Sequence, residues 1–198
     1  MSARIVVAAL GDSITAGSPG WDPDPRVREQ IPDPNPESQY EHWAELADPR
    51  LDFRNCGVYG ERSDEIARRL EGCAAGAHLL IVQGGINDVA QGRPVEAAAA
   101  DLRAMVRRGR ELGLTVLLAD VLPWNNGFPR AAEPIRRLND LLVQVSRKER
   151  VPLLPFRDTL EDADRPDRMR DEWTSDGDHP SVEGYRLLGE LVASFLSR

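Results

Sequence analysis

The chain has 198 residues, of which 41% are hydrophobic and 29% charged, a balance typical of a globular protein with a sizeable core. Its net charge of −8 argues against a nucleic-acid partner, because nucleic acids bind surfaces rich in Lys and Arg. No apolar run is long enough to cross a bilayer or to form the core of a signal peptide, so we expect no stable membrane insertion and a cytoplasmic location.

Strand-like and helix-like segments alternate along the chain. Five apolar runs are expected to form strands, and they lie at residues 5–10, 51–58, 78–83, 114–122 and 151–154. Apolar residues at helical spacing predict helices at residues 38–47, 94–112, 135–145 and 184–196. Ser38 and Glu41 form a capping-box pattern at the start of the first of these helices. The alternation predicts one α/β domain over residues 1–198, with helices on both faces of a parallel sheet.

Two segments lack this regularity. Residues 18–37 contain six prolines, which excludes a regular helix, and residues 157–175 are rich in charge and contain Pro166. Both segments adjoin candidate catalytic residues, so we expect both to line the functional site. The alternative is that they only connect neighbouring elements.

The sequence points to neither a metal nor a cofactor. Cys56 and Cys73 have no metal-ligand spacing, and three histidines are too few to suggest a zinc site. No glycine motif for binding phosphate or a dinucleotide is present. We expect the two cysteines to be reduced, partly buried thiols, as in a cytoplasmic protein, and a disulfide between them is the alternative.

A hydroxyl group follows the first predicted strand, in the sequence Gly11-Asp12-Ser13. Ligands of open α/β sheets bind outside the carboxyl ends of the strands, so Ser13 is placed to act as a nucleophile. The far end of the chain supplies Asp176 and His179, three residues apart. A serine together with an Asp-x-x-His pair is the skeleton of a hydrolytic triad, which occurs in several chain orders.

Four separated blocks carry a resemblance to a known family. They are Gly11-Asp12-Ser13, Asn55-Cys56-Gly57-Val58-Tyr59-Gly60, Gly85-Ile86-Asn87-Asp88 and Asp176-Gly177-Asp178-His179-Pro180. In this order they resemble the blocks of SGNH hydrolases of the GDSL esterase/lipase family, and the likeness runs from residue 4 to residue 198. The resemblance implies a three-layer α/β/α sandwich whose five parallel strands have the flavodoxin-like order 2-1-3-4-5.

The base that activates Ser13 must come from the three histidines. His42 lies in a predicted helix, and His78 opens the third strand at the end of the sheet opposite the serine. His179 lies in a loop before the final helix and matches the family motif, so it is the expected base.

Asp176 is the expected acid of the triad, because one short loop can hold its carboxylate against the His179 ring. Asp178 is the rival, at a position where the family usually has an apolar residue. We expect the Asp178 side chain to face away from the ring and toward solvent. Asp12 and Asp88 are expected to be structural, bonding loop backbone near the site.

Acyl transfer also needs hydrogen-bond donors for the developing oxyanion. The resemblance aligns the Gly60 N–H and the Asn87 side-chain amide with two of them, and the Ser13 N–H would be the third. Gly57 competes with Gly60, since either glycine allows close approach of the backbone to a ligand.

The sequence thus predicts a serine hydrolase that cleaves a small-molecule carboxylic ester of short or medium acyl chain through an acyl-enzyme, and it makes no prediction of oligomeric state. Carbohydrate O-deacetylation and thioesterase or lysophospholipase activity are the alternatives at the same site. A non-catalytic binding domain is the alternative of a different class. Trp21, Trp124 and Trp173 fall near the predicted active end, either as an acyl wall or sugar platform or as local loop anchors.

Overall fold

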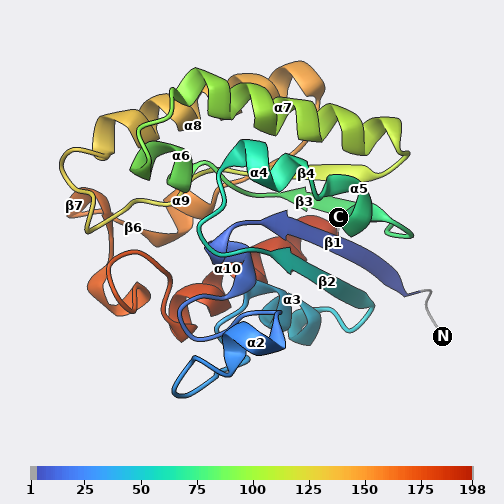
Figure 1. The fold of residues 1–198 in the computed structure, drawn as a ribbon, viewed down its shortest axis with the longest axis horizontal. Helices are drawn as coiled ribbons and strands as arrows, with labels where there is room; N and C mark the ends of the chain where they lie inside the picture. The colour runs from blue at the N-terminus through green and yellow to red at the C-terminus, as the bar shows by residue number, and fades with distance from the viewer. Residues whose placement is uncertain (1–3, 198) are drawn as a thin grey trace.

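A computed structural model of the protein describes residues 4–197. Its centre is a sheet of five parallel strands in the order β2-β1-β3-β4-β5 (Figure 1). The strands are β1 (Ile5–Gly11), β2 (Leu51–Gly57), β3 (Leu79–Val82), β4 (Thr115–Ala119) and β5 (Leu153–Leu154). The predicted fold class and strand order are confirmed.

Helices cover both faces of this sheet (Figure 1). One face carries α4 (Ser63–Ala67), α5 (Leu70–Ala74), α7 (Val95–Glu111) and α8 (Ala132–Glu149), and the other carries α3 (Tyr40–Ala47), α9 (Phe156–Leu160) and α10 (Val182–Leu196). Ala8 and Leu10 of β1 pack into the first core, whereas Val7 and Ala9 pack into the second. Burial on both faces explains why this strand is apolar throughout and could be predicted.

The fourth strand ends earlier than predicted, at Ala119 instead of residue 122. Beyond it, the N–H and the carbonyl of Val121 both pair with the side-chain amide of Asn139, at 2.8 Å each. A side chain of helix α8 therefore takes the backbone groups that a longer strand would have offered to its neighbours.

The predicted capping box of Ser38 and Glu41 is wrong. Helix α3 begins at Tyr40, its N-cap is Gln39, and no side chain caps it. Glu41 is only 3% exposed, and burial raises the pKa of its carboxyl well above the ordinary value. Glu41 is the second helical residue, not the third as a capping box requires, and its side chain is buried.

The two irregular segments contain short elements. Pro25 opens a single helical turn, α2 (Pro25–Arg28), a position where proline is tolerated because its missing N–H would have had no helical partner. The segment after β5 forms α9, the antiparallel pair β6 (Glu161–Asp162) and β7 (Arg165–Met169), and the 3-10 helix η1 (Asp171–Trp173). Arg157 forms ion pairs with Glu161 and Asp167 here, at 2.5 and 2.7 Å, so charges predicted to lie in a loop hold a hairpin together.

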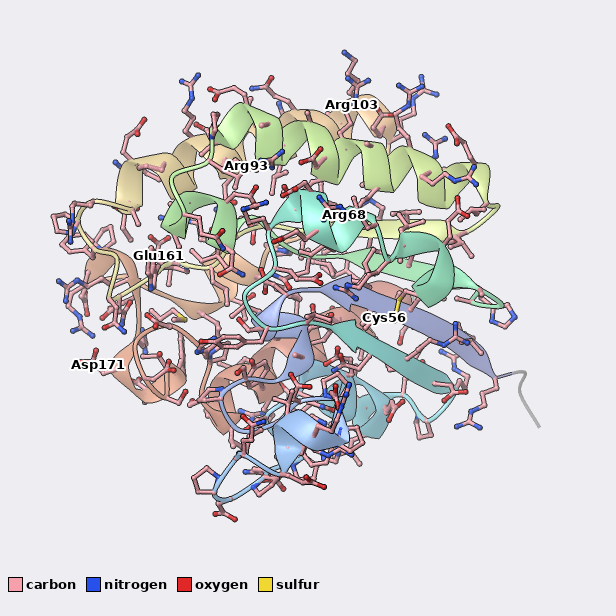
Figure 2. The ribbon with its side chains drawn as sticks, in the orientation of Figure 1. Cys56, Arg68, Arg93, Arg103, Glu161 and Asp171 are labelled. Carbon is pink, nitrogen blue, oxygen red and sulfur yellow. A yellow bond between two sulfur atoms is a disulfide. The ribbon has the colours of Figure 1, made fainter. Side chains whose placement is uncertain are left out.

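Cys56 of β2 and Cys73 of α5 form a disulfide, visible as the yellow bond beside the Cys56 label in Figure 2. Their Cα atoms are 6.1 Å apart, within the range that a disulfide requires. The expectation of two reduced thiols is therefore wrong, because the return of the chain from β2 through α4 to α5 brings the cysteines together.

Within residues 4–197, no helix is both long enough and apolar enough to cross a membrane.

Candidate active site

Ser13 is the first residue of the short helix α1 (Ser13–Ala16), directly beyond the carboxyl end of β1. Asp12 caps this helix, and its side chain accepts a hydrogen bond of 3.0 Å from the Ile14 N–H. Burial raises the pKa of Asp12 to about 6, although the hydrogen bond from Ile14 opposes the rise. Asp12 thus has the structural role that the sequence predicted, and it fixes the backbone that presents Ser13.

The three predicted triad residues form one hydrogen-bonded chain. His179 Nε2 lies 3.0 Å from Ser13 Oγ, and His179 Nδ1 lies 2.9 Å from Asp176 Oδ2. The other carboxylate oxygen of Asp176 accepts the backbone N–H of His179 at 2.8 Å and that of Asp178 at 2.9 Å. Partial burial favours a higher pKa for Asp176, but the bonds from the His179 ring and from these N–H groups outweigh it and lower the pKa. Asp176 therefore stays ionised beside the imidazole.

The loop that holds Asp176 and His179 is fixed at both ends. Thr174 pairs with Pro180 in an isolated antiparallel bridge, and the Thr174 hydroxyl donates to the His179 carbonyl at 2.8 Å. Gly177 turns the chain between them with a φ of +85°, a conformation that glycine adopts without strain. The three-residue spacing between Asp176 and His179 is thus the length of one closed turn.

Asp178 faces away from the ring nitrogen, as predicted, but it does not point to solvent. Its Oδ1 accepts hydrogen bonds from Trp124 Nε1 at 2.5 Å and from Asn126 Nδ2 at 2.7 Å. Asn126 Nδ2 also donates to the Asp176 carbonyl at 2.9 Å. The segment after β4 therefore braces the loop that carries Asp176 and His179.

The three predicted oxyanion donors meet at the hollow that contains Ser13 Oγ. This hollow has a volume of about 130 Å³, and Ser13, Gly60 and Asn87 all line it. Within residues 4–197, the N–H groups of Ser13 and Gly60 have no hydrogen-bond acceptor. Asn87 Nδ2 donates one hydrogen to the Glu61 carbonyl at 3.0 Å, which leaves its second hydrogen for a ligand.

The geometry separates Gly60 from its rival Gly57. The Gly57 N–H donates to Asn55 Oδ1 at 2.9 Å, so it is already used. A Cβ atom on Gly57 would lie 2.0 Å from the backbone N of Ala16. Close packing against Ala16 is therefore a sufficient reason for a glycine at position 57. Gly60 lines the hollow and has a φ of +76°, a backbone conformation that favours glycine. A glycine at position 60 therefore allows the turn that places its N–H at the hollow.

Asn87 is positioned by its neighbour in the sequence. It lies in the first turn of α6 (Ile86–Ala90), after the carboxyl end of β3. Asp88 is fully buried and accepts bonds of 2.9 Å from both the N–H and the hydroxyl of Ser63. Arg93 donates to the same carboxylate at 2.6 Å. Asp88 therefore ties α6 to the start of α4, just beyond Gly60, and is structural as predicted.

Other residues of the hollow were not predicted as site residues. They are Ile14, Tyr59, Ile86 and Ala90; Asp178, considered only as the rival of Asp176, lines the hollow as well. The Tyr59 ring stacks on the His179 ring with centroids 6.4 Å apart and an angle of 28° between the planes, and Tyr59 is 64% exposed. Tyr59 directly precedes Gly60 in the second sequence block, and this position could have indicated that its side chain lies at the site.

Trp124 lines the hollow, whereas Trp21 and Trp173 do not. Trp21 stacks under the Arg28 guanidinium, 4.6 Å from it, and Trp173 stacks under Arg170 at 4.7 Å. No residue of segments 18–37 and 157–175 lines the hollow either. The expectation that both segments line the site is therefore wrong. The first segment is tied to α10 through the Tyr185 hydroxyl, which donates to the Ser18 carbonyl at 3.1 Å, and the second folds into the end of α9, the β6–β7 pair and η1.

The family is decided by a comparison over most of the chain. A model of the GDSL-like lipase/acylhydrolase family matches residues 9–187. The chain belongs to this family. The resemblance to SGNH hydrolases is thus confirmed, and the GDSL protein is a hydrolase. No curated protein shows significant similarity to it.

Solved structures share the fold of this GDSL hydrolase at low sequence identity. A protein of Desulfitobacterium hafniense DCB-2 assigned to the lipolytic G-D-S-L family is 22% identical, with a TM-score of 0.80 over 96% of this chain and 99% of the other. A G-D-S-L family member from Veillonella parvula DSM 2008 is 19% identical, with a TM-score of 0.79 over 98% and 100%. A mutant of an acetyl-xylooligosaccharide esterase from Geobacillus stearmophilus is 16% identical, with a TM-score of 0.76 over 100% and 96%.

Across residues 4–197, no three His, Cys, Asp or Glu side chains gather as a metal would require. The absence of a cofactor stays a prediction.

Proposed function

We propose that the protein is a serine esterase that hydrolyses a short-chain carboxylic ester through an acyl-enzyme. The observation that carries the proposal is the hydrogen-bonded chain Ser13–His179–Asp176, which ends at the hollow lined by the three candidate oxyanion donors. A nucleophile, a base oriented by a carboxylate and donors for negative charge are the groups that acyl transfer requires.

In the proposed reaction, His179 Nε2 takes the proton of Ser13 Oγ as the oxygen attacks the ester carbonyl carbon. The N–H groups of Ser13 and Gly60 and the amide of Asn87 donate to the resulting oxyanion. The intermediate collapses, the C–O bond to the alcohol breaks, and His179 gives its proton to the leaving oxygen. Water then attacks the acyl-enzyme with the same base, which releases the acid and restores Ser13.

The size of the hollow supports a short acyl group. Its volume of about 130 Å³ is well below the roughly 300 Å³ at which pockets for drug-sized ligands begin. A second hollow of about 330 Å³ shares Ala90 and Trp124 with it and offers room for the remainder of the substrate.

A series of p-nitrophenyl esters from acetate to decanoate tests this proposal. We expect kcat/KM to be highest for acetate or propionate and not to rise with longer acyl chains, because a methylene that finds no room in the hollow gains none of the ~0.8 kcal/mol that its burial would supply. A preference that rises steadily with chain length would contradict the short-chain proposal. A complete absence of hydrolysis, in a folded sample, would contradict the esterase itself.

Carbohydrate O-deacetylation is the second candidate, because Tyr59 offers an exposed aromatic ring beside the hollow. The protein also shares its fold with an acetyl-xylooligosaccharide esterase, which makes acetylated sugars a reasonable substrate to test. Release of acetate from acetylated xylose oligosaccharides is compared with hydrolysis of p-nitrophenyl acetate. A higher kcat/KM on the oligosaccharides would favour the deacetylase, and activity on the nitrophenyl ester alone would favour the simple esterase.

Replacing Asn87 by Ala tests the oxyanion proposal. The loss of one such donor costs about 10²–10³ in kcat, because its hydrogen bond strengthens as charge develops on the oxygen. We therefore expect Asn87→Ala to lower kcat by that factor and to change KM little. A change confined to KM would mean that Asn87 only binds substrate.

A cytoplasmic location remains a prediction, and the Cys56–Cys73 disulfide weighs against it. Disulfides persist mainly in oxidising compartments, since cytoplasmic thiols are kept reduced.

A further inference from the structure

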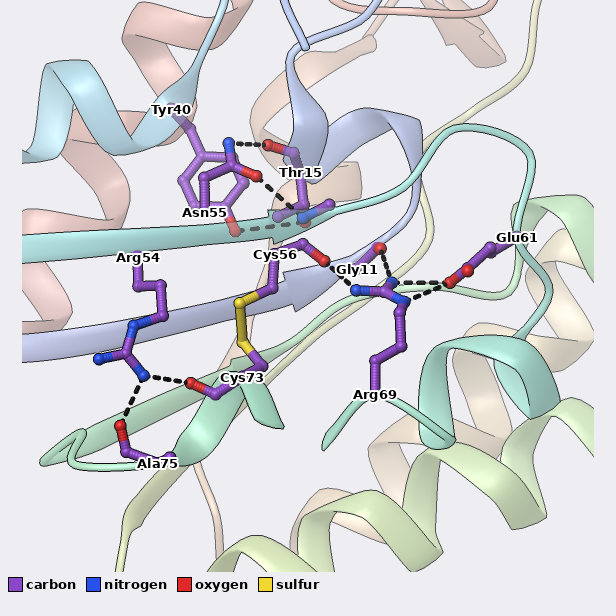
Figure 3. Close-up of a disulfide and its surroundings, with 11 residues drawn as sticks. Gly11, Thr15, Tyr40, Arg54, Asn55, Cys56, Glu61, Arg69, Cys73 and Ala75 are labelled. Atoms are coloured by element: carbon purple, nitrogen blue, oxygen red, sulfur yellow. Dashed lines mark hydrogen bonds and ion pairs between the residues drawn. A yellow bond between two sulfur atoms is a disulfide. The ribbon is translucent and has the colours of Figure 1, made fainter. Parts of the chain in front are cut away.

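Arg69 joins three segments of the chain that meet at the candidate active site. It is the residue just before α5, and its side chain is only 27% exposed. Its Nη1 donates to the Cys56 carbonyl at 2.6 Å, and its Nη2 donates to the Gly11 carbonyl at 3.0 Å. Nε and Nη2 both donate to Glu61 Oε2, at 2.8 and 2.7 Å (Figure 3). One planar guanidinium therefore bonds the ends of β1 and β2 and the loop that follows β2.

Two of these segments carry candidate catalytic groups. Gly11 precedes Ser13 by two residues, and Glu61 directly follows Gly60. The Glu61 carbonyl accepts the hydrogen bond from Asn87 Nδ2, so the backbone at Glu61 also positions the second oxyanion donor.

We propose that Arg69 is a positioning residue that fixes the Gly60 and Asn87 donors relative to Ser13. This inference rests on the esterase function proposed above. The fork shape of the guanidinium lets it satisfy two carbonyls and a carboxylate at once, which the single ammonium of a lysine cannot do in the same geometry. Because catalytic donors work only when they are aimed at the oxyanion, a shift of about 1 Å at this loop can cost about 10²-fold in rate.

Arg54 provides a matched control on the other side of the disulfide. Its Nη1 donates to the carbonyls of Cys73 at 2.7 Å and Ala75 at 2.6 Å, as Figure 3 shows. Like Arg69, it is an arginine bonded to backbone around the Cys56–Cys73 bridge. Unlike Arg69, its side chain has no hydrogen bond, within residues 4–197, to the segments that carry Ser13 and Gly60.

The test compares Arg69→Gln and Arg54→Gln with the parent on p-nitrophenyl acetate. We expect Arg69→Gln to lower kcat by about 10- to 100-fold with KM within about twofold of the parent. Arg54→Gln should leave both constants within about twofold. Arg69→Lys should keep the melting temperature closer to that of the parent but recover little of kcat. Equal kcat values for the two Gln variants would overturn the inference, and so would full recovery by Arg69→Lys.

A second readout uses the rate at which a fluorophosphonate phosphonylates Ser13. The rate should fall in Arg69→Gln in step with kcat and stay at the parent value in Arg54→Gln. If Arg69→Gln does not fold, Glu61→Gln replaces it; it removes the charged partner of Arg69, and we expect a loss of kcat of about tenfold, with no loss overturning the inference. A parent that neither hydrolyses ester nor reacts with the reagent would instead contradict the proposed function.

Discussion

Ser13→Ala is expected to lower kcat/KM for p-nitrophenyl acetate by about 10⁴- to 10⁶-fold, the loss that accompanies removal of a triad nucleophile. No other hydroxyl is held at 3.0 Å from His179 Nε2 among residues 4–197. The residual rate would come from the oxyanion donors and from binding alone.

The fold should survive this substitution. The Ser13 hydroxyl bonds only to His179 within the described residues, and alanine fits a small side chain that is 5% exposed. Ser194→Ala is the matched control, since among residues 4–197 its hydroxyl bonds only to the Leu191 carbonyl of its own helix. We expect both variants to melt within a few degrees of the parent, and only Ser13→Ala to lose activity. Activity that persists in a folded Ser13→Ala sample would mean that another group attacks the ester.

The second large effect is expected at Asp176. Asp176→Asn should lower kcat by about 10⁴-fold, because an amide facing His179 Nδ1 can hold the ring in the wrong tautomer. The low pKa of Asp176 means that the carboxylate is charged over the neutral range, so the whole effect should be present at pH 7.

Asp178→Asn is the control for this prediction. The side-chain oxygen of an asparagine can still accept the hydrogen bonds from Trp124 and Asn126, so the brace on the loop persists. The bonds lose the strength that a charged acceptor gives, about 1 kcal/mol, and we expect kcat to fall by no more than about tenfold. If Asp178→Asn abolished activity and Asp176→Asn did not, the acid of the triad would be misassigned.

The fold was predictable where burial imposes a pattern on the sequence. β1 is apolar throughout because Ala8 and Leu10 face one core and Val7 and Ala9 the other. Its end could also be located to within one residue, because the apolar run stops at Leu10 and the strand ends at Gly11. Ser13 and Asn87 could thus be placed as candidates because each follows a recognisable strand.

Features that depend on distant segments were not predictable. The surroundings of Asp178 are set by Trp124 and Asn126, more than 50 residues earlier in the chain. The disulfide depends on how the chain returns from β2 to α5, which the 17-residue separation of the cysteines does not reveal. Arg69 carries no local signal at all, because its partners come from three separate segments.

The central claim is that Ser13 is the nucleophile of a hydrolytic triad, and its most direct test is the mass of the intact protein after reaction with a fluorophosphonate, followed by peptide mapping. We predict a single adduct on Ser13, no adduct in Ser13→Ala, and slower labelling in Asp176→Asn, since the reagent reacts only with an activated hydroxyl held beside its base. A folded parent that forms no adduct would favour a non-catalytic binding domain, and an adduct on any other residue would contradict the assignment of Ser13.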